Sequence, residues 1–117
     1  MENAIRATRA TFESSCERTP EYLAWHRLFK REFTNFLKGK GCGEIEISKP
    51  NHFDMFGFFR AKSGQIFYFS ISDLRWCKSD MLIRTAEHYK DYTGGSNQSA
   101  CLTSLADFEH DFDRIVR

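Results

Sequence analysis

Apolar residues in the first third of the chain recur every three or four positions, the spacing of one face of an amphipathic helix. The strongest run consists of Tyr22, Trp25, Phe29, Phe33, Phe36 and Leu37. Thr19 precedes this run as a capping hydroxyl, and Pro20 suits the first helical position. Lys38 and Gly39 mark its end, because a cation and a residue able to turn left-handed are favoured there. The pattern predicts a long helix over residues 19–39, preceded by a shorter helix over residues 3–17.

After residue 43 the pattern changes to an alternation with a period of two, which is typical of β-strands. We expect strands over residues 44–48, 53–61 and 65–72, with residues 62–64 as a hairpin connection between the last two. Apolar side chains occupy both faces of those two strands, which indicates a central position covered at least partly on each side. Residues 81–86 are a further strand or a helical turn, and we favour a strand because the run is short.

The remaining residues predict a polar loop and a final helix. The loop covers residues 87–99, and Ser104 followed by Asp107 resembles a capping box at the start of the helix. Leu105, Phe108, Phe112, Ile115 and Val116 share one face of that helix. The expected fold class is α+β in a single domain over residues 1–117, with N-terminal helices, an antiparallel sheet of three to five strands and a C-terminal helix.

Composition narrows the class of protein. The chain has 117 residues and a formal net charge of +1, which by itself implies neither a nucleic-acid nor a membrane partner. No apolar run reaches membrane-spanning length, and the N-terminus lacks the apolar stretch of a secretory signal, so we expect a cytoplasmic protein with reduced cysteines. The four cysteines form no Cys-x-x-Cys pair, which argues against a structural zinc site, and we expect no cofactor.

The charged residues are unevenly distributed. The cations of the long predicted helix and its end are Arg27, Lys30, Arg31, Lys38 and Lys40. We expect them to form a stripe opposite the aromatic face, where they could contact successive phosphates of a nucleic acid. The alternative is an ordinary solvated helix face. Acidic residues cluster over 107–113, and we expect this acidic element and the basic one at opposite ends of the domain, with His26 at the surface.

The segment from Arg84 to Asn97 combines rings, both charge signs and a Gly-Gly pair without apolar periodicity. Such a loop beside apolar strands is a common location for binding residues. Tyr89, Lys90 and Tyr92 could stack on bases and contact phosphate, with Arg84 beside them, or the two tyrosines could simply anchor the loop to the sheet. The glycines could also direct backbone N–H groups at an anion, although the pattern is not a P-loop.

A second candidate site is catalytic. Pairing through the hairpin connection places Asp54 opposite Asp73 and His52 near Arg75. Two such carboxylates could bind Mg²⁺ or Mn²⁺ in a small nuclease, with His52 or His88 as the general base. An Asp–Arg–His network that only stabilises the end of the sheet is the alternative, and Arg75 then serves structure or partner binding.

Four segments together resemble a group of small proteins from phages and other mobile elements. They are His52-Phe53-Asp54 with Gly57-Phe58-Phe59, then Tyr68 to Arg75, then Leu82 to Ala86, and then Lys90 to Asn97. The resemblance covers roughly residues 50–98 and carries no catalytic role with it. It implies a context in which many proteins are anti-defence factors, including anti-CRISPR proteins that bind an effector or its guide RNA.

The leading hypothesis is a non-enzymatic, phage-type anti-defence (anti-CRISPR-like) inhibitor in the host cytoplasm. It would bind a host nucleoprotein effector, its guide RNA or another nucleic acid through the basic helix and the loop of residues 84–97. The alternatives are the metal-dependent nuclease just described and a structural or assembly protein of the phage. The oligomeric state and the choice between RNA, DNA and protein as the target stay open.

Overall fold

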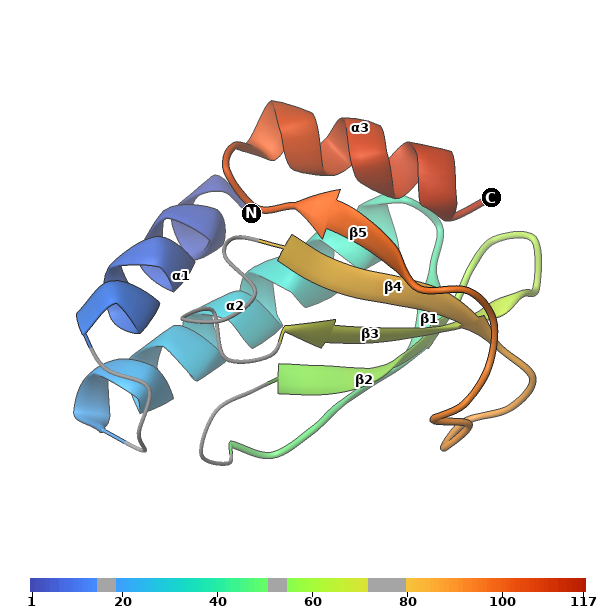
Figure 1. Ribbon diagram of the computed structural model, residues 1–117, viewed down its shortest axis with the longest axis horizontal. Coiled ribbons are helices and arrows are strands. Elements are labelled where there is room, and N and C mark those ends of the chain that lie inside the picture. The colour runs from blue at the N-terminus through green and yellow to red at the C-terminus, as the bar shows by residue number, and fades with distance from the viewer. Residues whose placement is uncertain (15–18, 51–54, 72–79) are drawn as a thin grey trace.

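Three helices and one five-stranded antiparallel sheet confirm the predicted α+β fold (Figure 1). The computed structural model describes residues 1–14, 19–50, 55–71 and 80–117, and in the first helix the side chains of residues 1–8. The helices are α1 (Glu2–Ser14), α2 (Pro20–Gly39) and α3 (Leu105–Ile115). The strands are β1 (Gly43–Ile47), β2 (Met55–Arg60), β3 (Ile66–Ile71), β4 (Asp80–Ala86) and β5 (Gln98–Cys101), and they lie in the sheet in chain order.

Helix α2 begins as predicted and ends slightly differently. The Thr19 hydroxyl accepts a hydrogen bond from the Tyr22 N–H at 3.1 Å, so the capping prediction is confirmed. The left-handed residue after the helix is Gly41, with φ +81°, and not Gly39. Gly41 N–H donates to the carbonyl of Lys38, and the next N–H reaches back to Leu37 at 2.9 Å. This double closure satisfies carbonyls at the helix end and turns the chain into β1.

The aromatic face of α2 packs on one face of the sheet. The Phe33 ring lies 4.9 Å from that of Phe69 and 6.4 Å from that of Phe59, both of which point toward the helices. Helix α3 joins the same layer, because the Phe36 ring lies 5.0 Å from that of Phe112. Side chains alternate along a strand, so the residues between these core positions face the opposite side of the sheet, away from the helices.

The acidic helix lies beside the basic one, which corrects the expectation that they occupy opposite ends. Lys40 Nζ contacts Glu109 Oε2 at 2.8 Å and Asp113 Oδ1 at 3.0 Å, and it lies over the Phe36 ring. The reason is tertiary, since the apolar faces of α2 and α3 share the same core and bring their polar flanks together.

The strands agree with the prediction in type and differ in detail. Residues 81–86 form a strand, β4, as favoured. Met55 lies opposite Ile71, one residue from the predicted register, because Ala61 and Gln65 close the hairpin with an N–H···O bond of 2.8 Å. Strand β5 begins inside the predicted loop of residues 87–99 and was missed. This strand is only four residues long. It forms because it pairs with β4, and no apolar pattern in its sequence predicts it.

His26 is buried, with 3 % of its surface exposed, so the prediction of a surface position is wrong. Its Nε2 lies 3.0 Å from the carbonyl oxygen of Ser48 and donates to it, which connects α2 to the end of β1. Burial lowers the pKa of His26, the bond to Ser48 acts against this, and nearby Lys30 lowers the pKa further. The imidazole is therefore neutral in the folded protein at neutral pH.

We predict that the folded protein loses stability as the pH falls below about 6.5. The unfolded chain takes up a proton on His26 near that pH, whereas the folded chain resists protonation, so the unfolded state binds more protons. His26→Gln, whose amide can still donate to Ser48, should flatten urea-unfolding stability between pH 7 and 5. The exposed His110 is the comparison, and His26→Gln should flatten the slope more than His110→Gln does. Equal slopes for His26→Gln and the wild type would contradict this account.

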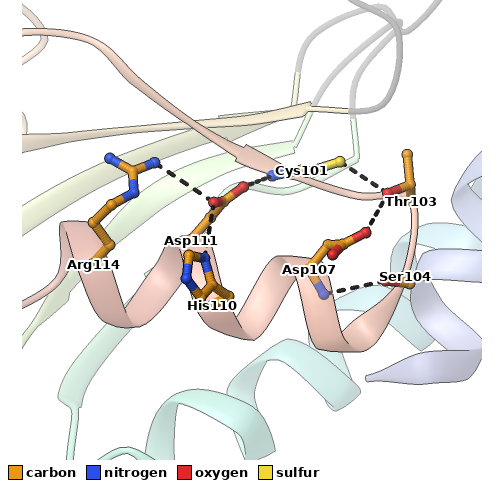
Figure 2. A network of polar contacts seen from close by, with 7 residues as sticks. All are labelled: Cys101, Thr103, Ser104, Asp107, His110, Asp111 and Arg114. Atoms are coloured by element: carbon orange, nitrogen blue, oxygen red, sulfur yellow. Dashed lines mark hydrogen bonds and ion pairs between the residues drawn. The ribbon is translucent and has the colours of Figure 1, made fainter.

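A polar network joins α3 to the edge strand β5 (Figure 2). Asp111 Oδ2 accepts a hydrogen bond from the Cys101 backbone N–H at 2.9 Å, and Arg114 Nη2 lies 3.6 Å from Asp111 Oδ1. At the other end of the network, the Ser104 hydroxyl accepts from the Asp107 N–H at 3.1 Å, which confirms the predicted cap. The bond from Cys101 is the main reason that the pKa of Asp111 is lowered.

We predict that Asp111→Ala costs about 1–2 kcal/mol of unfolding free energy at pH 7, since a charge-assisted hydrogen bond to a strand edge is lost. A lowered carboxyl pKa means that this contribution is present above the unfolded pKa of about 3.9 and disappears as the pH falls through the folded value. The difference from the wild type should therefore shrink in acid-range urea titrations. A difference that stays constant down to pH 3 would refute the assignment.

Candidate nucleic-acid interface

Three cations gather on the solvent face of α2. Arg27, Lys30 and Arg31 are exposed and line one shallow groove of about 310 Å³, together with Thr34 and Asn35. Positions four apart on a helix lie about 6 Å apart along its axis, so the two arginines form one row. None of the three cations forms an ion pair with any residue in the described part of the chain. This surface, which we call the basic groove, carries unneutralised positive charge.

The other two predicted cations of the stripe differ from each other. Lys38 is exposed and continues the row about two helix turns after Arg31. Lys40 is tied to α3 by Glu109 and Asp113, whose hydrogen bonds raise its pKa. Lys40 therefore connects two helices, and the structure does not bring it into the basic groove.

A larger pocket of about 490 Å³ opens next to the basic groove, between α2 and α3 and beside Met1. Arg31 and Asn35 line both the groove and the pocket. The half-buried Phe36 and Leu105 line the pocket and not the groove. Sequence reasoning missed Asn35, although its spacing from Arg27 and Arg31, at eight and four residues, places it on the same helix row. This spacing is the sequence signal that could have identified Asn35. Leu105 belongs to another helix, and no sequence pattern connects it with the site.

The pocket is also lined by two carboxylates that contact cations. Glu32 Oε1 lies 3.0 Å from the amino group of Met1 and accepts from the Ala4 N–H at 2.9 Å. Burial raises the pKa of Glu32, but these bonds outweigh it and the net pKa is lowered. Glu109 is paired with Lys40 at 2.8 Å. Lys40 is shared with Asp113, so Glu109 and Asp113 together keep a net negative charge at this side of the pocket, whereas Glu32 is balanced by the Met1 amino group.

The loop after β4 folds over the other face of the sheet. Tyr89 packs its ring 5.7 Å from that of Phe58, and its hydroxyl donates to the carbonyl of Glu44 at 2.6 Å. Burial is the main reason that the pKa of Tyr89 is raised. Tyr92 packs edge-on at 5.5 Å from Phe58 but keeps 50 % of its surface exposed. The predicted alternative, in which these rings anchor the loop, describes Tyr89 well and Tyr92 only in part.

Arg84 of β4 holds the same loop by hydrogen bonds to two of its residues. Its guanidinium lies 4.4 Å from the centre of the Tyr68 ring and donates to the carbonyl oxygen of Tyr92 and to Asn97 Oδ1. Lys90 is exposed at the tip, in a left-handed conformation with φ 74°. Arg84 thus has a structural role, whereas Lys90 and Tyr92 are the exposed ones among the loop residues predicted to contact a partner.

The glycine pair has a steric explanation. A Cβ on Gly94 would lie 2.4 Å from the backbone oxygen of Thr85, and one on Gly95 would lie 2.1 Å from the Thr85 hydroxyl. Asp91 accepts from the backbone N–H groups of Glu87 and Thr93, and these bonds lower its pKa. The loop needs glycine to approach β4 closely, which accounts for the pair without an anion.

The sheet separates the two predicted contact regions. The basic groove lies on the outer side of the helix layer, while Lys90 and Tyr92 belong to a loop packed on the opposite face of the sheet. A single flat partner surface cannot cover both. The predicted joint surface of helix and loop is therefore two surfaces.

The catalytic candidates lie mostly outside the described residues. His52, Asp54, Asp73 and Arg75 belong to segments that the structure leaves undescribed. His88 is exposed, and its Nδ1 lies 2.8 Å from the Tyr89 carbonyl. Within the described ranges, no three His, Cys, Asp or Glu side chains are grouped to hold a metal ion, which leaves the Asp54 and Asp73 hypothesis untested.

Comparisons with known proteins bring no relative. No family model, no curated protein and no solved structure matches this chain. Among the described helices, none has both the length and the apolar character that a membrane crossing requires. The surfaces themselves are therefore the basis for a functional proposal.

We predict that Gly94→Ala destabilises the protein by about 1–3 kcal/mol, because the new Cβ forces the loop away from Thr85. Ser96→Ala, at an exposed position in the same loop, should change stability by less than about 0.5 kcal/mol. Urea unfolding measures both. Isothermal titration with inorganic phosphate should show no binding by either variant or by the wild type, and saturable binding lost only in Gly94→Ala would favour the anion hypothesis.

Proposed function

We propose that this protein is a non-enzymatic binding protein that engages nucleic acid through the basic groove. The observation that carries the proposal is the gathering of Arg27, Lys30 and Arg31 on one exposed helix face, where none of them forms an ion pair with a described residue. Adjacent cations in a row match the regular charges of a phosphate backbone, and their contacts release condensed counterions. Lys38 extends the same row.

The local distribution of charge supports this function better than the net charge does. The whole chain carries only +1, so long-range attraction is weak. Many of its charges are paired, including Lys40 with two acids and Arg60 with Glu44 at 3.2 Å. Cations that remain unpaired in such a chain are the ones free to bind phosphates.

The proposed target is the nucleic acid of a host nucleoprotein, and the proposed role is that of a phage-type anti-defence inhibitor. The resemblance of residues 50–98 to small proteins of phages and mobile elements supports this context. On the far face of the sheet, the half-exposed Tyr92 and the exposed Lys90 are available to the protein component. Tyrosine is among the residues most often found at the centre of protein interfaces.

We predict that reversing the charges of the basic groove abolishes binding. The variant combines Arg27→Glu, Lys30→Glu and Arg31→Glu, all at exposed positions, so the fold should be retained. In fluorescence anisotropy with labelled RNA and DNA, the wild-type affinity should fall with salt, with a log–log slope of about −2 to −3 for three phosphate contacts. The variant should lose at least about tenfold in affinity at low salt.

The matched control changes the net charge equally and elsewhere. Lys49→Glu, Lys62→Glu and Arg117→Glu are combined, since all three side chains are exposed and lie outside the basic groove. This control should lose much less affinity than the groove variant. Unchanged binding by the groove variant would overturn the proposal. Probe fragments that form only with Mg²⁺ or Mn²⁺ would instead favour the nuclease hypothesis, with Asp73→Asn as the next variant.

A further inference from the structure

The basic groove and the pocket between α2 and α3 adjoin each other. Arg31 and Asn35 line both, so a strand whose phosphates lie along the arginine row has the pocket beside it. The pocket volume of about 490 Å³ lies within the range of about 300–1,000 Å³ that is usual for small-ligand sites. A group attached to the phosphate chain could therefore enter it.

The lining of the pocket suits a flat group with apolar faces and a polar edge. Phe36 and Leu105 are half-buried and supply apolar surface, although Lys40 Nζ lies over the Phe36 ring at 5.6 Å from its centre. Asn35 is exposed, and its amide, which has both donor and acceptor capacity, forms no hydrogen bond with the described residues. The carboxylates of Glu32 and Glu109 are already engaged by cations. A nucleobase has this combination of properties.

The far face of the sheet is less suited to bases. Phe58 is only 3 % exposed under the loop, and the Tyr68 ring is covered by Arg84. Glu46, Glu87 and Asp91 lie near that region and form no ion pair with the described residues, so they would repel phosphates. Base recognition there would need the loop to leave the sheet.

We propose that the pocket formed by Asn35, Phe36 and Leu105 accepts an unpaired nucleobase, so that the preferred ligand is single-stranded nucleic acid. This inference rests on the proposed function, because the basic groove holds the backbone beside the pocket. Duplexes keep their bases stacked inside, whereas single strands can present a base to a protein pocket. Asn35 provides the polar contact to the base edge, and Phe36 and Leu105 contact its apolar face.

The test compares three RNA probes of equal length by anisotropy: a single strand, a blunt duplex, and a strand with abasic sites that keeps every phosphate. The wild type should bind the base-bearing strand about five- to tenfold more tightly than the abasic strand. The same difference is expected against the duplex when its concentration is counted per strand. Asn35→Ala should reduce that preference about three- to tenfold and leave the salt slope unchanged. Thr34→Ala is the matched control, since Thr34 lines the groove and not the pocket.

The outcomes separate the inference from the proposed function. If all three probes bind equally and Asn35→Ala has no effect, while the groove variant still abolishes binding, the base pocket is refuted and the phosphate contact stands. If the groove variant binds like the wild type, or no probe binds, both proposals fail. Tyr92→Ala provides a check on the opposite face. Loss of the base preference in Tyr92→Ala alone would place base contact on the loop and refute the pocket.

Discussion

The packing of the α2 aromatic face on the sheet determines the rest of the molecule. Phe33 is fully buried and its ring contacts those of Phe29, Phe36, Phe59, Phe69 and Phe108, which come from two helices and two strands. Burial of large rings is the main source of stability in a domain of this size. Because this packing fixes the rotation of α2, it also directs Arg27 and Arg31 to solvent. The basic groove is thus a consequence of where the core lies.

The sheet is protected at both edges and on its open face. The pairing register of strand β1 shifts between Gly43 and Glu46, and the carbonyl oxygen of Glu44 accepts a hydrogen bond from the Tyr89 hydroxyl. At the other edge, the backbone N–H of Cys101 donates a hydrogen bond to the Asp111 carboxylate. Irregular strands and capped edge groups disfavour pairing with another strand. The accessible surfaces are therefore the helix layer and the tip of the loop rather than the sheet edges.

Some cations of this protein are bound by other parts of the fold, and others are exposed and could contact a partner. Lys40 and Arg84 carry charges that the fold uses, the first to connect α2 with α3 and the second to hold the loop. Exposed ion pairs contribute only about 0–1 kcal/mol each, so their main effect here is to remove charge from the surface. The cations of the basic groove are left with unsatisfied electrostatic potential. This potential is the basis of the proposed phosphate contact, and the proposed base pocket adjoins it.

The sequence alone determined the α+β class, the limits of α2 within one residue, the cap of α3 and the strand at 81–86, since these depend on local periodicity and on capping side chains. It also marked Arg27, Lys30 and Arg31, because helix geometry alone places them together. Tertiary packing decided the burial of His26, the pairing of Lys40 with α3, the strand β5 and the joining of Asn35 to Leu105. These depend on contacts between segments far apart in the chain, and no local pattern encodes which distant groups the core brings together.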